Sequence, residues 1–176
     1  MRGQRAVNGS VGAVARCYIG LGANLGDRLV ALRSAVAELS SLGPVVGRSS
    51  VWETEAVGPP PDYLNAVVAV DLDEAIAPDT LLDALEAIEA RQGRVRTLAR
   101  DTPRTLDLDV LLWEGRVINS ARLTVPHPRL HERLFVLEPL AEVAPEAAHP
   151  LLHRTIEGLR DDLPRGRRVR RLTEPL

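Results

Sequence analysis

Residues 103–113 read PRTLDLDVLLW, a stretch in which apolar and acidic side chains alternate before an apolar run. A period of two is typical of a half-buried β-strand. We therefore expect the alternating apolar side chains to face the core, namely Leu106, Leu108 and Val110. Asp107 and Asp109 then share the opposite face, with Cα atoms about 7 Å apart. The predicted strand presents two carboxylates side by side.

Two adjacent aspartates on one strand face repel each other unless a cation lies between them. Mg²⁺ prefers oxygen ligands of this kind, and two carboxylates can hold a pair of metal ions about 4 Å apart for in-line displacement at phosphorus. The residues alone leave a second interpretation open, the solvated face of an amphipathic strand, although Asp is a poor strand former. Asp107 and Asp109 are therefore a candidate metal site that their neighbours must support.

The segment that leads into this strand is strongly basic. Residues 94–104, RVRTLARDTPR, contain four arginines, and the whole chain contains no lysine. A Walker A loop needs a lysine on the phosphates, so a P-loop kinase is excluded, as is Schiff-base chemistry on lysine. Arginine binds phosphate oxygens bidentately and keeps its charge. Arginines followed by two aspartates indicate a site for phosphates and metal, and the remaining alternative is a solvated loop that neutralises the aspartates.

The composition bounds the rest of the interpretation. The 176 residues, 45% of them hydrophobic, suit one globular domain, and the formal net charge of −2 gives no drive toward nucleic acid or an anionic membrane. The single cysteine, Cys17, fits a reducing cytoplasm. We expect a cytoplasmic monomer with an extension at residues 1–15, one domain at residues 16–160 and a solvated, basic tail at residues 161–176.

Hydrophobic periodicity predicts a mixed fold. Strands are expected at residues 16–22, 45–54, 63–72 and 106–113, and helices at residues 28–42, 78–92 and from Leu130 onward. Asp27 is a suitable N-cap for the first helix, and Pro78 suits the first position of the second. The order βαββαβ predicts an α+β, ferredoxin-like fold, an antiparallel sheet with helices packed on it, plus a C-terminal helical extension.

Five segments together resemble one known family. They are YIGLGANLGD at residues 18–27, YLNA at 63–66, QGRVR at 92–96, PRTLDLD at 103–109 and LTVPH at 123–127. In this order they are similar to 6-hydroxymethyl-7,8-dihydropterin pyrophosphokinases of folate biosynthesis. The resemblance implies a ferredoxin-like fold and transfer of pyrophosphate from ATP to the hydroxymethyl group of the pterin, with release of AMP. The formal net charge and the lack of an apolar run long enough to span a bilayer indicate no nucleic-acid or membrane partner.

The resemblance also implies roles for individual residues. Asp107 and Asp109 would hold two Mg²⁺ ions on the triphosphate of ATP, the co-substrate. Arg94 and Arg104 would stabilise charge on the transferring phosphates, with Arg96 assisting. Further contacts to ATP would come from Glu89, Arg122, Thr124, His127 and Arg133. The pterin ring would lie between Tyr63 and Phe135, and its hydrogen-bonding edge would meet Thr54, Val57 and Asn65. Tyr63 and Phe135 are two of only five Phe, Trp and Tyr residues, and a flat heterocycle needs such stacking partners.

Three positions depart from the family pattern. Asp101-Thr102 stands where some members have Trp-Gly, so the loop would have to seal the site without that aromatic. Glu86 replaces a glutamine that contacts nucleotide in some members, and Glu55 replaces a proline on the pterin side. None of the three is a predicted metal ligand.

Two other functions compete with this one. A phosphohydrolase or nuclease could use the same aspartates, but it would need a water-activating base that the sequence does not offer. A non-catalytic ferredoxin-like module that binds RNA or a small ligand would not need paired aspartates, and RNA-binding versions carry exposed aromatics on the sheet.

Overall fold

The computed structural model describes residues 13–56, 61–94, 104–164 and 169–176. Within these ranges the main sheet is antiparallel throughout and has six strands, in the order β10-β3-β4-β1-β5, with β2 also paired to β4. Its strands are β1 (Val14–Ala23), β2 (Val45–Arg48), β3 (Trp52–Thr54), β4 (Tyr63–Asp73), β5 (Asp107–Trp113) and β10 (Val169–Arg171). Two small hairpins pair β6 (Ile118–Asn119) with β7 (Thr124–Val125), and β8 (Ala148–His149) with β9 (Arg154–Thr155).

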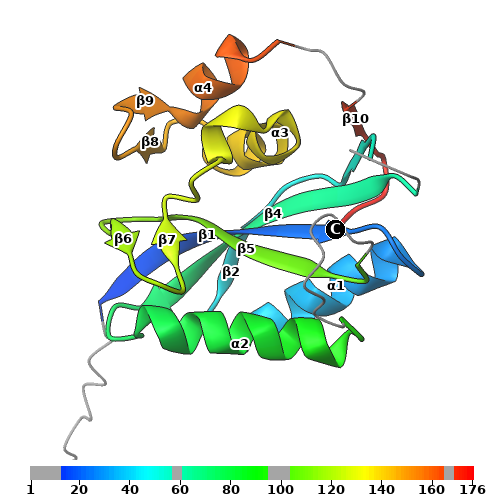
Figure 1. Cartoon of the computed structure of the whole chain (residues 1–176), viewed down its shortest axis with the longest axis horizontal. Coiled ribbons are helices and arrows are strands. Elements are labelled where there is room, and N and C mark those ends of the chain that lie inside the picture. Colours follow the sequence, from blue (N-terminus) through cyan, green and yellow to red (C-terminus); the bar gives the residue numbers. More distant parts are fainter. Residues whose placement is uncertain (1–12, 57–60, 95–103, 165–168) are drawn as a thin grey trace, which may run out of the picture.

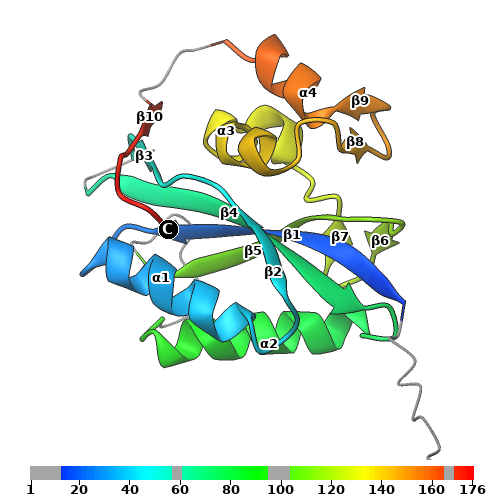
Figure 2. The same ribbon diagram turned by 180° about the vertical axis from the view of Figure 1, so that it is seen from behind.

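Helices cover both faces of this sheet. The helices α1 (Arg28–Leu39) and α2 (Pro78–Arg91) lie on one face, and α3 (Leu134–Val143) and α4 (Ile156–Asp162) lie on the other (Figures 1 and 2). Each face has its own hydrophobic core. The chain is thus a mixed α and β structure built on an antiparallel sheet, as the sequence predicts. None of the helices in the described ranges is long and apolar enough to cross a membrane.

Strand β5 confirms the alternation read from the sequence. Leu106, Leu108 and Val110 are buried in the core beneath α1 and α2. Asp107 and Asp109 are half-buried on the opposite face of the strand. The two carboxylates therefore share one face.

The predicted strand at residues 45–54 is wrong as a single element, because it divides into β2 and β3. At the break, the backbone N–H of Ser49 donates to the carbonyl of Val67 at 2.9 Å, while the Ser49 hydroxyl accepts the N–H of Val67 at 2.9 Å. A side chain thus takes the place of a backbone carbonyl in the ladder, and regular pairing stops there.

Two helix predictions also need correction. Helix α1 ends at Leu39 rather than at residue 42, because the hydroxyls of Ser40 and Ser41 donate to carbonyls in its last turn, at 2.6 and 2.7 Å. The helix predicted from Leu130 is interrupted. A 3₁₀ turn, η1 (Leu130–Glu132), is followed by Arg133 in an extended conformation before α3 begins.

Both predicted ends of the domain differ from the structure. Strand β1 begins at Val14, which pairs with Asp73, so the ordered sheet starts within the predicted extension. In the predicted basic tail, Val169–Arg171 form β10, the edge strand beside β3. Hydrogen bonding to β3 is the physical reason that this part of the tail is not simply solvated.

Candidate active site

A pocket of about 610 Å³ opens on the sheet face that carries Asp107 and Asp109. Most of the predicted site residues line it. They are Thr54, Tyr63, Asn65, Arg104, Asp107, Asp109, Arg133 and Phe135. The sheet supplies one wall, residues between Arg129 and Val136 supply another, and Leu163, Pro164 and Val169 near the C-terminus also line the pocket. The structure thus joins the predicted acidic and aromatic groups in one cavity.

Strand register sets the order of these groups. Gly22 in β1 pairs with Asn65 of β4 on one side and with Asp107 of β5 on the other. Directly paired residues of antiparallel strands project from the same face. Asn65 and Asp107 therefore stand at the two ends of a row whose central residue has no side chain. Two residues earlier in β1, Gly20 pairs with Asp109 in the same way. A Cβ on Gly20 would lie 3.2 Å from the Leu111 side chain.

The carboxylates differ in their surroundings. The Asp107 carboxylate receives one guanidinium on each oxygen, from Arg94 and Arg104, both at 2.6 Å. Burial raises the pKa of Asp109 to about 6, and the negative charge of Asp107 adds to the effect. Asp109 therefore carries negative charge that its protein neighbours do not fully offset, and a cation would stabilise it.

Glu89 fixes the strand that carries the pair. Its buried carboxylate accepts the backbone N–H of Leu108 at 2.7 Å and forms an ion pair with Arg94. The backbone N–H of Arg94 in turn donates to the Glu89 carbonyl at 3.1 Å. Glu89 therefore links β5 and Arg94 to α2, and the contact to ATP that the resemblance implies for it stays a prediction.

Asn24 is a site residue that the sequence analysis missed. It is 2% exposed, lines the pocket, and its side-chain oxygen accepts the backbone N–H of Arg104 at 2.7 Å. Its own N–H donates to the Arg104 carbonyl at 3.1 Å. The only signal in the sequence is an Asn in a glycine-rich turn, which is common in loops without function.

Thr54 and Asn65 form the polar part of the other end of the pocket. The Asn65 amide donates to the Thr54 hydroxyl at 2.8 Å, and both side chains are buried. Tyr63 and Phe135 line the same pocket from β4 and α3. The Arg133 guanidinium lies 5.7 Å from the centre of the Phe135 ring. This end can therefore hold a flat, polar-edged ring.

The remaining predicted contacts lie elsewhere. Arg122 lies outside the pocket lining and pairs with Asp83 on α2 at 2.7 Å, with Glu86 3.6 Å away. Thr124 lies in β7, and the His127 ring accepts the N–H of Arg129 at 3.1 Å. Burial lowers the pKa of His127, and Arg133 and Arg129 lower it further. Val57 and Arg96 fall outside the described residues.

The protein supplies part of a ligand set that suits Mg²⁺, and the phosphates of a bound substrate would supply the rest. Asp107 and Asp109 supply hard oxygen ligands, and the described ranges hold no group of three or more potential ligand side chains. Mg²⁺ is commonly held by one or two carboxylates together with substrate phosphates and water. The charge left on Asp109 is consistent with this arrangement.

The raised pKa of Asp109 predicts how stability depends on pH. Because its ordinary value is 3.8 and its folded value is about 6, the folded state holds a proton that the unfolded state has lost between these pH values. The free energy of unfolding should therefore fall by about 1–3 kcal/mol as pH rises through this window. Asp109→Asn should remove the loss, so that above pH 7 the variant is the more stable protein.

Urea unfolding with EDTA, from pH 4 to 7.5, measures the difference. Asp161→Asn, at an exposed carboxylate of α4, controls for the loss of one negative charge. A gap between wild type and Asp109→Asn that stays constant with pH would contradict the prediction.

Comparison with known proteins gives consistent matches. The family model described as 7,8-dihydro-6-hydroxymethylpterin-pyrophosphokinase matches residues 18–145. A 2-amino-4-hydroxy-6-hydroxymethyldihydropteridine pyrophosphokinase of Synechocystis is 45% identical over 141 residues, 78% of this chain and 71% of the relative. The Pseudomonas aeruginosa protein of the same name is 41% identical over 141 residues, 78% of this chain and 85% of the relative.

A solved structure shares the fold. Wild-type HPPK-DHPS of Plasmodium falciparum superposes with a TM-score of 0.66 at 14% identity, covering 86% of this chain. The chain spans 45% of the length of that protein.

Proposed function

The chain belongs to the 7,8-dihydro-6-hydroxymethylpterin-pyrophosphokinase family, and from this premise we propose that it transfers the pyrophosphoryl group of ATP to the hydroxymethyl group of 6-hydroxymethyl-7,8-dihydropterin. The products would be the pterin diphosphate and AMP, in folate synthesis. One observation carries the proposal: a single pocket joins an acidic pair with arginines at one end to an aromatic and amide-lined space at the other.

The acceptor half of the pocket suits the pterin. Tyr63 and Phe135 can contact the two faces of the ring, which aromatic side chains favour. The hydrogen bond between Asn65 and Thr54 fixes the amide, so that its remaining polar groups can meet the edge of the heterocycle. A preformed amide loses little entropy when the ring binds. These residues bind and orient the acceptor.

The donor half suits a triphosphate. Asp107 and Asp109 would hold two Mg²⁺ ions, which when bound neutralise charge on the phosphate oxygens. Arg104 and Arg133 line this part of the pocket, and Arg94 lies against Asp107. Phosphoryl transfer depends mainly on positioning and charge stabilisation. The arginines would stabilise negative charge on the β- and γ-phosphates as the pterin hydroxyl attacks the β-phosphorus in line.

The ferredoxin-like topology of the sheet, the oligomeric state and the cellular location are proposals as well. The order β5-β1-β4-β3 with two crossing helices supports a ferredoxin-like topology. Small-molecule substrates, a monomeric state and a cytoplasmic location stay predictions from the sequence.

A nucleotide product assay tests the function directly. ATP, Mg²⁺ and the purified chain are incubated with and without 6-hydroxymethyl-7,8-dihydropterin. AMP that forms only with the pterin, without free pyrophosphate, is the expected result. ADP as product, or AMP with pyrophosphate regardless of pterin, would indicate a phosphohydrolase on the same carboxylates. No nucleotide turnover would favour the non-catalytic module.

Replacing Phe135 should separate the two substrates. Phe135→Ala removes one face of the proposed aromatic pair and should weaken pterin binding about tenfold, while ATP binding changes less than threefold. Phe135→Leu keeps apolar volume without a ring and should fall between wild type and alanine. Isothermal titration with each substrate measures both affinities. Equal losses for pterin and ATP would assign Phe135 to the core of α3 instead.

A further inference from the structure

The C-terminal strand β10 lies outside the segment that the family model matches, residues 18–145. It is nevertheless built into the sheet. Arg170 pairs with Glu53 in register, and beyond the strand the N–H of Leu172 donates to the carbonyl of Val51 at 2.8 Å. Further on, the Arg33 guanidinium of α1 donates twice to the carbonyl of Pro175, at 3.1 and 2.7 Å. The strand is therefore held from both the sheet and α1.

One side chain of β10 reaches the pocket. Val169 pairs directly with Thr54, and both line the cavity. Directly paired residues lie on the same face of the sheet. Since Thr54 holds the Asn65 amide, Val169 is the apolar neighbour of the polar groups proposed to meet the pterin edge. Leu163 and Pro164, which precede the strand, line the same cavity.

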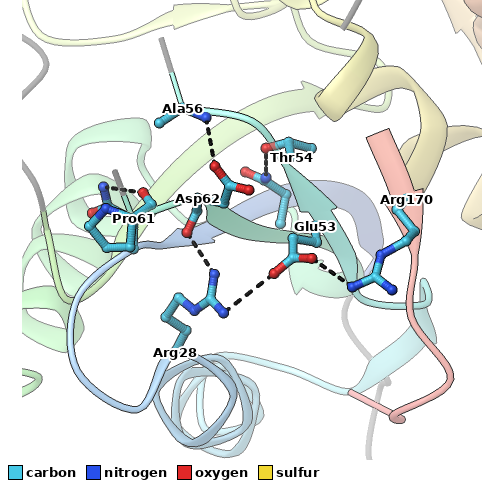
Figure 3. Close-up of polar contacts among 9 residues, drawn as sticks. Arg28, Glu53, Thr54, Ala56, Pro61, Asp62 and Arg170 are labelled. Atoms are coloured by element: carbon cyan, nitrogen blue, oxygen red, sulfur yellow. Dashed lines mark hydrogen bonds and ion pairs between the residues drawn. The ribbon is translucent and has the colours of Figure 1, made fainter. Parts of the chain in front are cut away.

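The next side chain points to the other face and forms an ionic chain (Figure 3). The Arg170 guanidinium binds one oxygen of Glu53 at 2.7 Å, and the Arg28 guanidinium lies 3.4 Å from the other oxygen. Arg28 also donates to the backbone carbonyl of Asp62 at 2.7 Å. The Asp62 carboxylate in turn accepts the N–H of Ala56 at 3.3 Å. Glu53 thus connects β10 to both flanks of the connection between β3 and β4.

We propose that β10 is part of the pterin-binding site: Val169 forms its apolar wall beside Thr54, and Arg170, through Glu53, positions the strand and the residues that flank the β3–β4 connection, of which Glu55 and Ala56 line the pocket. Val169 is a binding residue and Arg170 is a positioning residue. This inference deepens the proposed function and rests on it.

The electrostatics of Glu53 agree with the geometry. The hydrogen bond from Arg170 is the largest cause of a lowered pKa at Glu53, and the charges of Arg170 and Arg28 act in the same direction. The carboxylate is 19% exposed, whereas Arg170 is 65% exposed. Because Arg170 is largely exposed, its ion pair contributes little to global stability, so the loss of Arg170 should leave the chain folded and change mainly the local geometry.

Binding measurements on the full chain test this. The variants are Val169→Ala, Arg170→Ala and Arg170→Lys. The matched control is Arg91→Ala, which removes an ion pair of similar length, 2.6 Å, between α2 and Glu38 of α1. The probes are 6-hydroxymethylpterin and a non-hydrolysable ATP analogue with Mg²⁺, each titrated by calorimetry, with thermal unfolding of every variant.

Both alanine variants of β10 should weaken pterin binding about threefold to tenfold, with nucleotide affinity within twofold of wild type. Arg170→Lys should recover part of the loss, and Arg91→Ala should show none. Equal losses of affinity for both probes, or unchanged pterin affinity in Val169→Ala and Arg170→Ala, would overturn this inference. In either case, pterin binding by the wild type would still support the proposed function. Absence of pterin binding by the wild type would overturn both.

Discussion

Asp107→Ala and Asp109→Ala should each lower kcat for AMP formation about a thousandfold, which corresponds to about 4 kcal/mol of transition-state stabilisation. Each change removes one of the two carboxylates proposed to hold Mg²⁺ against the triphosphate. Residual activity should no longer respond to the Mg²⁺ concentration in the range that saturates the wild type. Quenched-flow or steady-state detection of AMP, across a Mg²⁺ titration, measures both effects.

The two variants should differ in stability, which separates a catalytic effect from unfolding. Asp107→Ala leaves Arg94 and Arg104 without their shared carboxylate and should lower the free energy of unfolding by about 1–3 kcal/mol. Asp109→Ala removes a partly buried charge that raises the cost of folding, so at pH 7.5 the variant should not be less stable by this mechanism. Asp161→Ala serves as the exposed control. Full activity in either site variant would refute the assignment.

Arg104→Ala should lower kcat about a hundredfold or more, because the guanidinium proposed to contact the transferring phosphates would stabilise charge that develops in the transition state. The backbone of Arg104 is fixed to Asn24, and its side chain lies 2.6 Å from Asp107. This pre-organisation means that the group need not be recruited during the reaction. Pterin affinity should change less than threefold.

Arg104→Lys keeps the charge but loses the bidentate geometry, so it should recover only part of kcat. Arg91→Ala, whose ion pair joins α1 and α2, is the control and should keep wild-type kcat. Steady-state kinetics with each substrate varied give kcat and both KM values. A change confined to the KM for ATP would show that Arg104 contributes uniform binding rather than transition-state stabilisation.

The parts of the fold that could be predicted from sequence are those set by local patterns. The alternation at residues 106–110 fixes which face of β5 carries the carboxylates, and an amphipathic stripe identifies α1 and α2. The aspartates, Arg104 and Phe135 were predicted as site residues, and the structure brings them into one pocket. Their roles in binding and catalysis stay predictions.

Other features depend on contacts that no local pattern reveals. The extended backbone of Arg133 interrupts a segment whose apolar spacing favours a continuous helix, and this break separates η1 from α3. Strand β10 forms only because a distant edge, β3, offers backbone partners. Arg122 rests on the carboxylates of α2 because Asp83 and Glu86 project toward it. Such pairings are decided by tertiary structure.

Gly22, between Asn65 and Asp107, has a consequence for how specificity can evolve. The proposed acceptor end at Asn65 and the proposed metal end at Asp107 are two strand spacings apart, about 10 Å, and backbone hydrogen bonds set this span. If Tyr63 and Phe135 contact the ring as proposed, substitutions there would change which ring is accepted without moving the backbone that carries the carboxylates. Conversely, a Cβ at position 22 would already lie 3.5 Å from the Asn65 side-chain oxygen and 3.9 Å from the Asp107 Cβ, so a bulky residue there would press on both ends of the pocket at once.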